Sequence, residues 1–116
     1  MSNQISIFHK PKCSKSRQTL QLLKDNNIDP GVIEYLKEPP GANEIASLID
    51  KLGIEPHELL RTKEKEYKGA GLSKDSSADE IIAAIAANPI LLERPVVVNG
   101  DKAAIGRPPE NVLGIL

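Results

Sequence analysis

The sequence contains a single cysteine, Cys13, and basic residues lie close to it on both sides. Lys12 precedes it, Lys15 and Arg17 follow it, and His9 lies shortly before it. A thiol becomes a nucleophile when positive charges and hydrogen-bond donors stabilise its thiolate. With one cysteine, the chain can form neither an internal disulfide nor a multi-cysteine zinc cluster. Cys13 is therefore either an inert buried side chain or a reactive thiol.

The local pattern favours the reactive thiol. Residues 4–8 alternate polar and apolar side chains, which predicts a strand. Leucines between positions 20 and 23 predict a helix from Ser14 to about Asn27, because asparagine tolerates the left-handed conformation that ends a helix. Cys13 would then lie at a helix N-terminus, where unpaired N–H groups and the helix dipole favour the thiolate.

His9 and three arginines are further candidates for a site around Cys13. His9 could be a general base, an orienting donor or an exposed loop residue. Arg94 and Arg107 each precede a proline, which holds their backbone extended, and Arg61 follows a short predicted helix. A guanidinium group suits a tetrahedral oxyanion because its planar fork donates two parallel hydrogen bonds. Sequence spacing alone does not bring these arginines to Cys13, since most arginines lie on the solvated surface.

The first half of the chain predicts a β-α-β unit followed by helices. A second strand is expected at 32–36, ended by the prolines at 39 and 40, and the crossover should be right-handed. Apolar side chains at 45, 48, 49 and 52 predict a helix that Gly53 ends. A short helix is expected from Pro56 to Leu60, with His57 on the surface, and residues 62–76 are expected to be a polar, partly mobile connection.

The second half predicts one more helix and a hairpin. Ser77 and Glu80 have capping-box spacing for a helix that continues to Asn88. Strands at 95–98 and 102–105 flank Asn99-Gly100, a pair that accepts the positive φ of a type I′ turn. A last helix should begin at Pro109 and bury Val112, Leu113 and Leu116.

This order of elements predicts a thioredoxin-like α/β fold. Its four-stranded mixed sheet would be flanked by helices, with an all-helical insert at about 42–88 between strands two and three. At 116 residues and 12.6 kDa, the chain is expected to be a single domain, 1–116, and a monomer.

Composition excludes several classes of function. The formal net charge of −1, with 15 basic and 16 acidic residues, gives no broad attraction to nucleic acid or to a membrane surface. Residues 1–4 lack the basic and apolar regions of a signal peptide, and no run of about 18 apolar residues could span a membrane. We therefore expect a cytoplasmic protein, with no partner among nucleic acids or membranes.

Five separated segments resemble the glutaredoxin-coupled arsenate reductase family, which belongs to the thioredoxin superfamily. They are HKPKCSKSR at 9–17, YLKEPP at 35–40, LLRTK at 59–63, NPILLERPVVV at 88–98 and IGRP at 105–108. These segments occur in order across nearly the whole chain, which is far more specific than one cysteine motif.

The resemblance implies an oxidoreductase in which the cysteine at position 13 attacks arsenate, a small oxyanion. The adduct then reacts with glutathione as co-substrate, and the partner protein glutaredoxin reduces the mixed disulfide while arsenite leaves. The resemblance also implies no bound cofactor or metal, and a cis peptide bond before Pro95. The residue roles it implies are catalytic or oxyanion-binding arginines at Arg61, Arg94 and Arg107, a histidine at His9 that tunes the thiolate pKa, and substrate binding by Lys15, Ser16 and Arg17.

Two departures point to a less-characterised branch, and they leave the physiological substrate open. Ser14-Lys15-Ser16 follows Cys13 where well-established members have Gly-Thr-Ser, and Lys10 stands where they have asparagine. An alternative is a redox regulator resembling Spx, which binds RNA polymerase, although its Cys-x-x-Cys switch would need a cysteine at position 16. A second alternative is a thiol-transfer protein like the monothiol glutaredoxins. A phosphatase is disfavoured because its Cys-x5-Arg loop is absent here.

Overall fold

The computed structural model describes residues 5–116, so that Gln4, expected in the first strand, and residues 1–3 lie outside the described residues. The chain divides into two compact units. The first combines the N-terminal part up to Glu38 with Arg94–Leu116, and the second is Pro39–Glu93. The helices of the predicted insert belong to the second unit.

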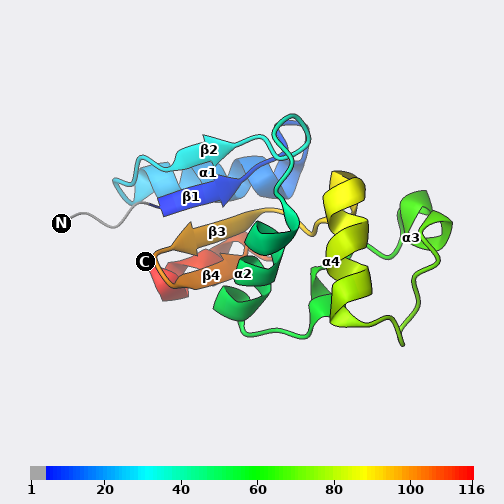
Figure 1. Ribbon diagram of the computed structural model, residues 1–116. Helices are drawn as coiled ribbons and strands as arrows, with labels where there is room; N and C mark the ends of the chain where they lie inside the picture. Colours follow the sequence, from blue (N-terminus) through cyan, green and yellow to red (C-terminus); the bar gives the residue numbers. More distant parts are fainter. Residues whose placement is uncertain (1–4) are drawn as a thin grey trace. The chain divides into compact units, whose positions relative to one another are not determined.

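The first unit is built on a mixed four-stranded sheet with the order β2-β1-β3-β4 (Figure 1). Its strands are β1 (Ile5–Phe8), β2 (Gly31–Ile33), β3 (Val96–Asn99) and β4 (Lys102–Ile105). β1 and β2 run parallel, whereas β1 with β3 and β3 with β4 are antiparallel. The predicted thioredoxin-like plan, a mixed sheet flanked by helices, is therefore confirmed.

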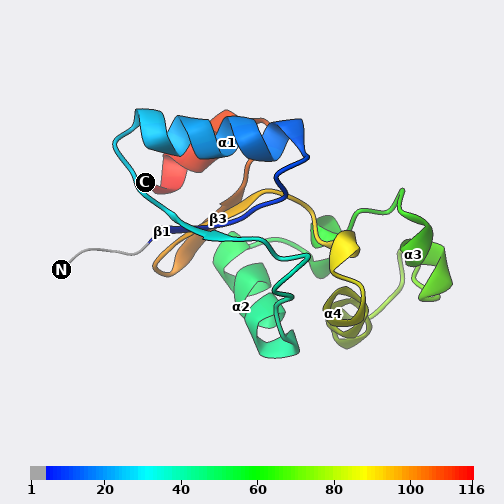
Figure 2. The same ribbon diagram turned by 90° about the horizontal axis from the view of Figure 1, so that it is seen from above.

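Helix α1 (Ser14–Asp25) and the 3₁₀ helix η3 (Pro109–Ile115) cover the same face of this sheet (Figure 2). The core on that face contains four fully buried aliphatic side chains, Ile7, Leu23, Val97 and Val112. Burying one such side chain contributes about 1.5–3 kcal/mol relative to leaving it exposed. Helix α1 ends as expected, with Asn27 in the left-handed region at φ 62°.

The last helix differs from its prediction because it has 3₁₀ rather than α geometry. In a 3₁₀ helix, side chains three positions apart lie above one another. Val112 and Ile115 therefore share the face that packs on the core. Leu113 and Leu116, which we expected to be buried, are each 43% exposed.

The second strand is shorter than predicted and ends at Ile33 instead of Leu36. The carbonyl oxygen of Glu34 accepts hydrogen bonds of 2.9 Å from the N–H groups of both Lys37 and Glu38. These bonds turn the chain before the prolines at 39 and 40 are reached. Tyr35 is fully buried in this turn, so its apolar ring belongs to a turn rather than to a strand.

The β3–β4 hairpin has the predicted position but a different turn. Asn99 pairs with Lys102, so the two central residues are Gly100 and Asp101 rather than Asn99 and Gly100. Gly100 has a φ of 64°, and Asp101 does not have a positive φ. A positive φ at the first central position only is typical of a type II′ turn, where glycine is preferred.

The second unit is helical, with α2 (Ala42–Leu52), α3 (Lys65–Gly69), α4 (Ala78–Ala87) and the 3₁₀ helices η1 (Pro56–Leu59) and η2 (Pro89–Leu91). Gly53 ends α2 at φ 65°, and the Ser77 capping box begins α4, both as predicted. The connection at 62–76 contains α3, a helix that we did not predict, and its expected partial mobility stays a prediction. This helix has one turn and no buried residue, so it leaves no apolar periodicity in the sequence.

His57, which we expected on the surface, is half-buried and contacts Tyr67. Its Nε2 lies 2.8 Å from the hydroxyl of Tyr67, and the two rings meet edge to face at a centroid distance of 5.7 Å. The side chain is half-buried and joins η1 to α3. In the described part of the chain, no helix is both long enough and apolar enough to cross a bilayer.

Candidate active site

Strand register in the first unit brings several chain segments to one edge of the sheet. Phe8 pairs with Ile33 on one side and with Val96 on the other, and Val96 also pairs with Ile105. The C-terminal ends of β1, β2 and β4 therefore meet the N-terminal end of β3 (Figure 1). The segments that continue from these ends are 9–13, 34–37, 94–95 and 106–107.

Cys13 occupies the N-cap position of α1, as the sequence predicted. Its N–H donates to the carbonyl of Lys10 at 2.9 Å, which closes a tight turn. Burial raises the pKa of the thiol, whereas hydrogen bonds from the backbone N–H groups of Ser16 and Lys15 and from the Arg94 side chain lower it. The charge of Arg94 lowers it further, and the net pKa of Cys13 lies below its ordinary value. The thiol of Cys13 therefore ionises at a lower pH than an unperturbed cysteine.

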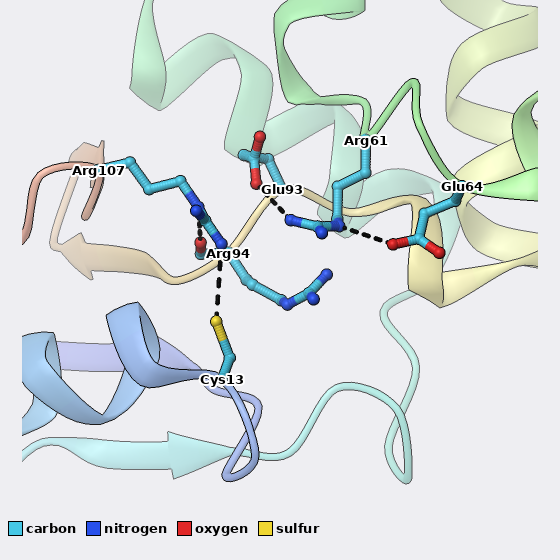
Figure 3. Close-up of polar contacts among 6 residues, drawn as sticks. All are labelled: Cys13, Arg61, Glu64, Glu93, Arg94 and Arg107. Carbon is cyan, nitrogen blue, oxygen red and sulfur yellow. Dashed lines mark hydrogen bonds and ion pairs between the residues drawn. The ribbon is translucent and has the colours of Figure 1, made fainter.

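Arg107 reaches the sulfur of Cys13 (Figure 3), and the side chain of Arg94 also lowers the pKa of the thiol. Arg94 is only 6% exposed, and its side chain lowers the pKa of the Cys13 thiol through hydrogen bonding and through its charge. Nη2 of the exposed Arg107 lies 3.6 Å from Sγ, while its Nε donates to the carbonyl of Arg94 at 2.7 Å. The bond between Arg94 and Pro95 is cis, as predicted, and so is the bond between Arg107 and Pro108.

His9 is buried, so the interpretation of it as an exposed loop residue is wrong. The ring atom Nδ1 lies 2.6 Å from Oγ of Ser16, and the backbone N–H of His9 donates to the carbonyl of Ile33 at 2.8 Å. Burial lowers the pKa of His9, and Arg17 and Lys24 lower it further against an opposing contribution from Glu34. His9 is therefore neutral near pH 7 and is linked to the thiolate through Ser16, whose N–H donates to the sulfur.

The three residues predicted to bind substrate make different contacts. Ser16 is fully buried. Its Oγ accepts a hydrogen bond from the backbone N–H of Lys10 at 3.1 Å and is also hydrogen-bonded to Nδ1 of His9. Lys15 directs its backbone N–H at the sulfur. Nη1 of Arg17 donates to the carbonyl of Pro11 at 2.9 Å, which stiffens the loop that leads to the thiol. Their binding of substrate stays a prediction.

Arg61 lies in the second unit, where two carboxylates hold it (Figure 3). Its Nε is 3.2 Å from Glu64 and its Nη1 is 3.1 Å from Glu93. Its backbone N–H donates to the carbonyl of Leu91 at 2.8 Å, beside the bridge between Leu60 and Leu92. The predicted role of Arg61 in catalysis stays a prediction.

Gly106 and Thr19 support the site and were missed by sequence reasoning. The N–H of Gly106 donates to the carbonyl of Pro95 at 2.9 Å. A Cβ at position 106 would lie 2.5 Å from Oγ1 of Thr19 and 2.9 Å from Cγ of Pro95. The absence of a side chain therefore lets the chain bring Arg107 close to Cys13. The only sequence signal was the glycine immediately before Arg107-Pro108.

The arrangement suits attack by sulfur on an anion. A thiolate at a helix N-terminus faces two guanidinium groups, which can balance the negative charge of both the nucleophile and a tetrahedral oxyanion. Within residues 5–116, no cluster of three or more His, Cys, Asp or Glu side chains could hold a metal ion.

Comparison with known proteins identifies relatives along the whole chain. The model of the ArsC family matches residues 8–115. The uncharacterized protein YfgD of Escherichia coli K12 is 48% identical, over 100% of this chain and 99% of its own length. An arsenate reductase of Haemophilus influenzae is 47% identical, over 97% of this chain and 98% of its own. The structure of an arsenate reductase from Vibrio cholerae matches with a TM-score of 0.94 and 45% identity, covering 100% of both chains.

Proposed function

The chain belongs to the ArsC family, and on that premise we propose that it is an arsenate reductase whose nucleophile is Cys13. The single observation that supports this most is the contact of Arg94 and Arg107 with a thiol whose pKa is lowered. An inert buried cysteine packs as a small apolar side chain and is not stabilised by two neighbouring guanidinium groups.

In the first proposed step, the thiolate of Cys13 displaces one hydroxyl group of arsenate. A sulfur–arsenic bond forms, and the hydroxyl leaves as water after taking up a proton. Arg94 and Arg107 hold the remaining oxygens and balance their charge, because each guanidinium can donate two parallel hydrogen bonds. The role of Arg61 as a further oxyanion-binding arginine rests on the family resemblance alone.

In the second step, glutathione and the thiol of a glutaredoxin reduce arsenic from +5 to +3. Each thiol supplies one electron and the two become a mixed disulfide, so arsenite and free Cys13 are released. An external thiol is required because Cys13 is the only cysteine of the chain. The need for glutathione also places the proposed reaction in the cytoplasm, where thiols are kept reduced.

His9, Ser16, Lys15 and Arg17 support the nucleophile in this proposal. The N–H groups of Ser16 and Lys15 stabilise the thiolate directly. His9 orients Ser16 through the 2.6 Å hydrogen bond, and Arg17 holds the loop through Pro11. His9 and Arg17 therefore have positioning roles, whereas Ser16 and Lys15 contact the sulfur that reacts.

The test is arsenate-dependent oxidation of NADPH in the presence of glutathione, glutaredoxin and glutathione reductase. We expect Cys13→Ser to abolish the rate, and Arg94→Ala to lower kcat/KM for arsenate by about 100-fold or more, as for the loss of one charge-stabilising donor. Lys102→Ala, which removes an exposed lysine of β4, is the control. An unchanged rate in Cys13→Ser would refute the proposal. Reduction of a glutathionylated peptide without any arsenate reduction would instead favour a thiol-transfer protein.

A further inference from the structure

A pocket of about 500 Å³ lies on the first unit beside the loop that leads to Cys13. One wall is the loop 9–12, and the other is formed by Glu34, Leu36 and Lys37 from the turn after β2. Its volume lies within the range of about 300–1,000 Å³ that is usual for small-molecule sites. The pocket has no part in holding the oxyanion in the mechanism above.

The charges around this pocket are mixed but mainly positive. Lys10, Lys12 and Lys37 supply three ammonium groups against the single carboxylate of Glu34. Nζ of Lys37 lies 3.5 Å from Oε1 of Glu34, and the Lys37 side chain is 79% exposed, so this pair can open at little cost. The pocket therefore fits a ligand that carries more than one carboxylate together with one ammonium group.

The pocket also has an apolar part. Pro11 and Leu36 line it, and Leu36 is 41% exposed although its side chain is large and aliphatic. His9, which also lines it, is neutral near pH 7 because burial lowers its pKa. A ligand with methylene groups between its charged ends could cover these side chains.

The pocket and the nucleophile belong to the same tight turn. Lys12 is bonded to Cys13 in the chain, and the N–H of Cys13 donates to the carbonyl of Lys10 at 2.9 Å. A small ligand anchored by the lysines thus lies beside the segment that holds the reacting sulfur. Cys13 itself does not line the pocket, so a co-substrate bound there must extend past this turn to react with an adduct on the sulfur.

We propose that this pocket is the binding site for glutathione, the thiol co-substrate, which rests on the proposed function above. The two carboxylates of glutathione pair with Lys10, Lys12 or Lys37, and its ammonium group pairs with Glu34. Its methylene groups cover Pro11 and Leu36. Arsenate has neither methylene groups to cover Pro11 and Leu36 nor an ammonium group to pair with Glu34, so it matches this pocket less well.

Binding can be tested without any turnover. The probe is S-methylglutathione, which has no free thiol, added to the full-length Cys13→Ser variant while the backbone amide resonances are followed by NMR. We expect saturable shifts at Lys10, Lys12 and the segment 34–37, and weaker binding in Lys37→Ala. The absence of saturable shifts at millimolar probe, or shifts confined to the neighbourhood of Pro95 and Arg107, would overturn the proposal.

Kinetics in the coupled assay give the second test. Lys10→Ala and Lys37→Ala should each raise KM for glutathione about two- to fivefold, as for the loss of one solvent-exposed charge pair, without raising KM for arsenate. Lys102→Ala is the matched control for loss of one positive charge. Equal KM values for glutathione in all variants would overturn the proposal. If the wild-type protein reduces no arsenate, the proposed function fails, while the NMR titration still decides whether the pocket binds the tripeptide.

Discussion

Adding one methyl group at Gly106 should destabilise the protein and impair the site together. A Cβ at this position would lie 2.5 Å from Oγ1 and 3.1 Å from Cγ2 of Thr19, and 2.9 Å from Cγ of Pro95. Thr19 cannot rotate away freely, because it is fully buried and its Oγ1 donates to the carbonyl of Lys15 at 2.8 Å. The backbone at 106 must therefore shift, and Arg107 shifts with it.

The expected size follows from two opposing effects. Forcing an extra methyl into a packed interior costs about 1–3 kcal/mol. Replacing glycine by alanine also restricts the unfolded chain, which stabilises by about 0.4–1 kcal/mol. We expect Gly106→Ala to lower the free energy of unfolding by about 1–2 kcal/mol, with roughly 4 °C lost in Tm for each kcal/mol in a chain of this length.

A double-mutant cycle with Thr19 isolates the clash. Thr19→Ala removes both atoms that approach the new methyl and leaves only the ring of Pro95. Adding the methyl should then cost less in the Thr19→Ala background than in the wild type, although Pro95 Cγ still lies 2.9 Å away, which gives a coupling energy of about 1 kcal/mol. Urea unfolding measures the cycle, and kcat/KM for arsenate shows whether Arg107 regains its position.

Gly114→Ala is the matched control, because a Cβ at position 114 would meet no atom within 4 Å. We expect it to unfold with a free energy equal to or slightly above that of the wild type. Equal stability of the two alanine variants, or additive effects in the Thr19 cycle, would refute the assignment of Gly106 as a point of close packing.

Three further predictions concern the thiol, the histidine and a helix cap. Arg107→Ala should shift the pH dependence of Cys13 alkylation by iodoacetamide to higher pH, because the thiolate loses a donor at 3.6 Å; an unchanged profile would contradict this contact. The NMR titration of His9 should have its midpoint below the ordinary value of 6.5, so the unfolded chain binds the proton first. The contribution of His9 to the free energy of unfolding is therefore fully present above pH 6.5 and is lost as the pH falls through the pKa of the folded state. A midpoint above 6.5 would mean that protonation of His9 stabilises the folded chain instead. Ser77→Ala should lower the free energy of unfolding by about 1 kcal/mol in urea, because the N–H of Glu80 loses its acceptor; no change would mean that α4 does not depend on its cap.

Local sequence signals predicted the parts of the fold that depend on neighbouring residues. The capping box at Ser77, the left-handed end of α2 at Gly53 and the N-cap position of Cys13 all depend on a few adjacent residues, and all three are confirmed. The extended backbone expected for the arginines before the prolines at 94 and 107 also follows from local sterics, and it stays a prediction.

Features that depend on longer-range contacts were harder to predict. The 3₁₀ geometry of η3 changes which apolar side chains face the core, and leucines at 113 and 116 gave no local sign of it. Gly106 looked like an ordinary loop residue, because its closest neighbour would be Thr19 in a distant helix. The carboxylates that hold Arg61 include Glu93, which is remote from it in the sequence. Such contacts follow from packing and cannot be obtained from spacing.

The core of the first unit specifies the geometry of the candidate site. Ile7 on β1 pairs with Val97 on β3, and both are fully buried on the face covered by α1. A slip of one residue by either strand would turn the buried side chains of that strand away from the core, which makes the register strongly preferred. The same register aligns Phe8 with Val96, so that the segment leading to Cys13 and the segment holding Arg94 emerge at one edge of the sheet. Apolar burial at Ile7 and Val97 therefore stabilises the position of the guanidinium group beside the thiolate, although neither side chain touches the reacting atoms.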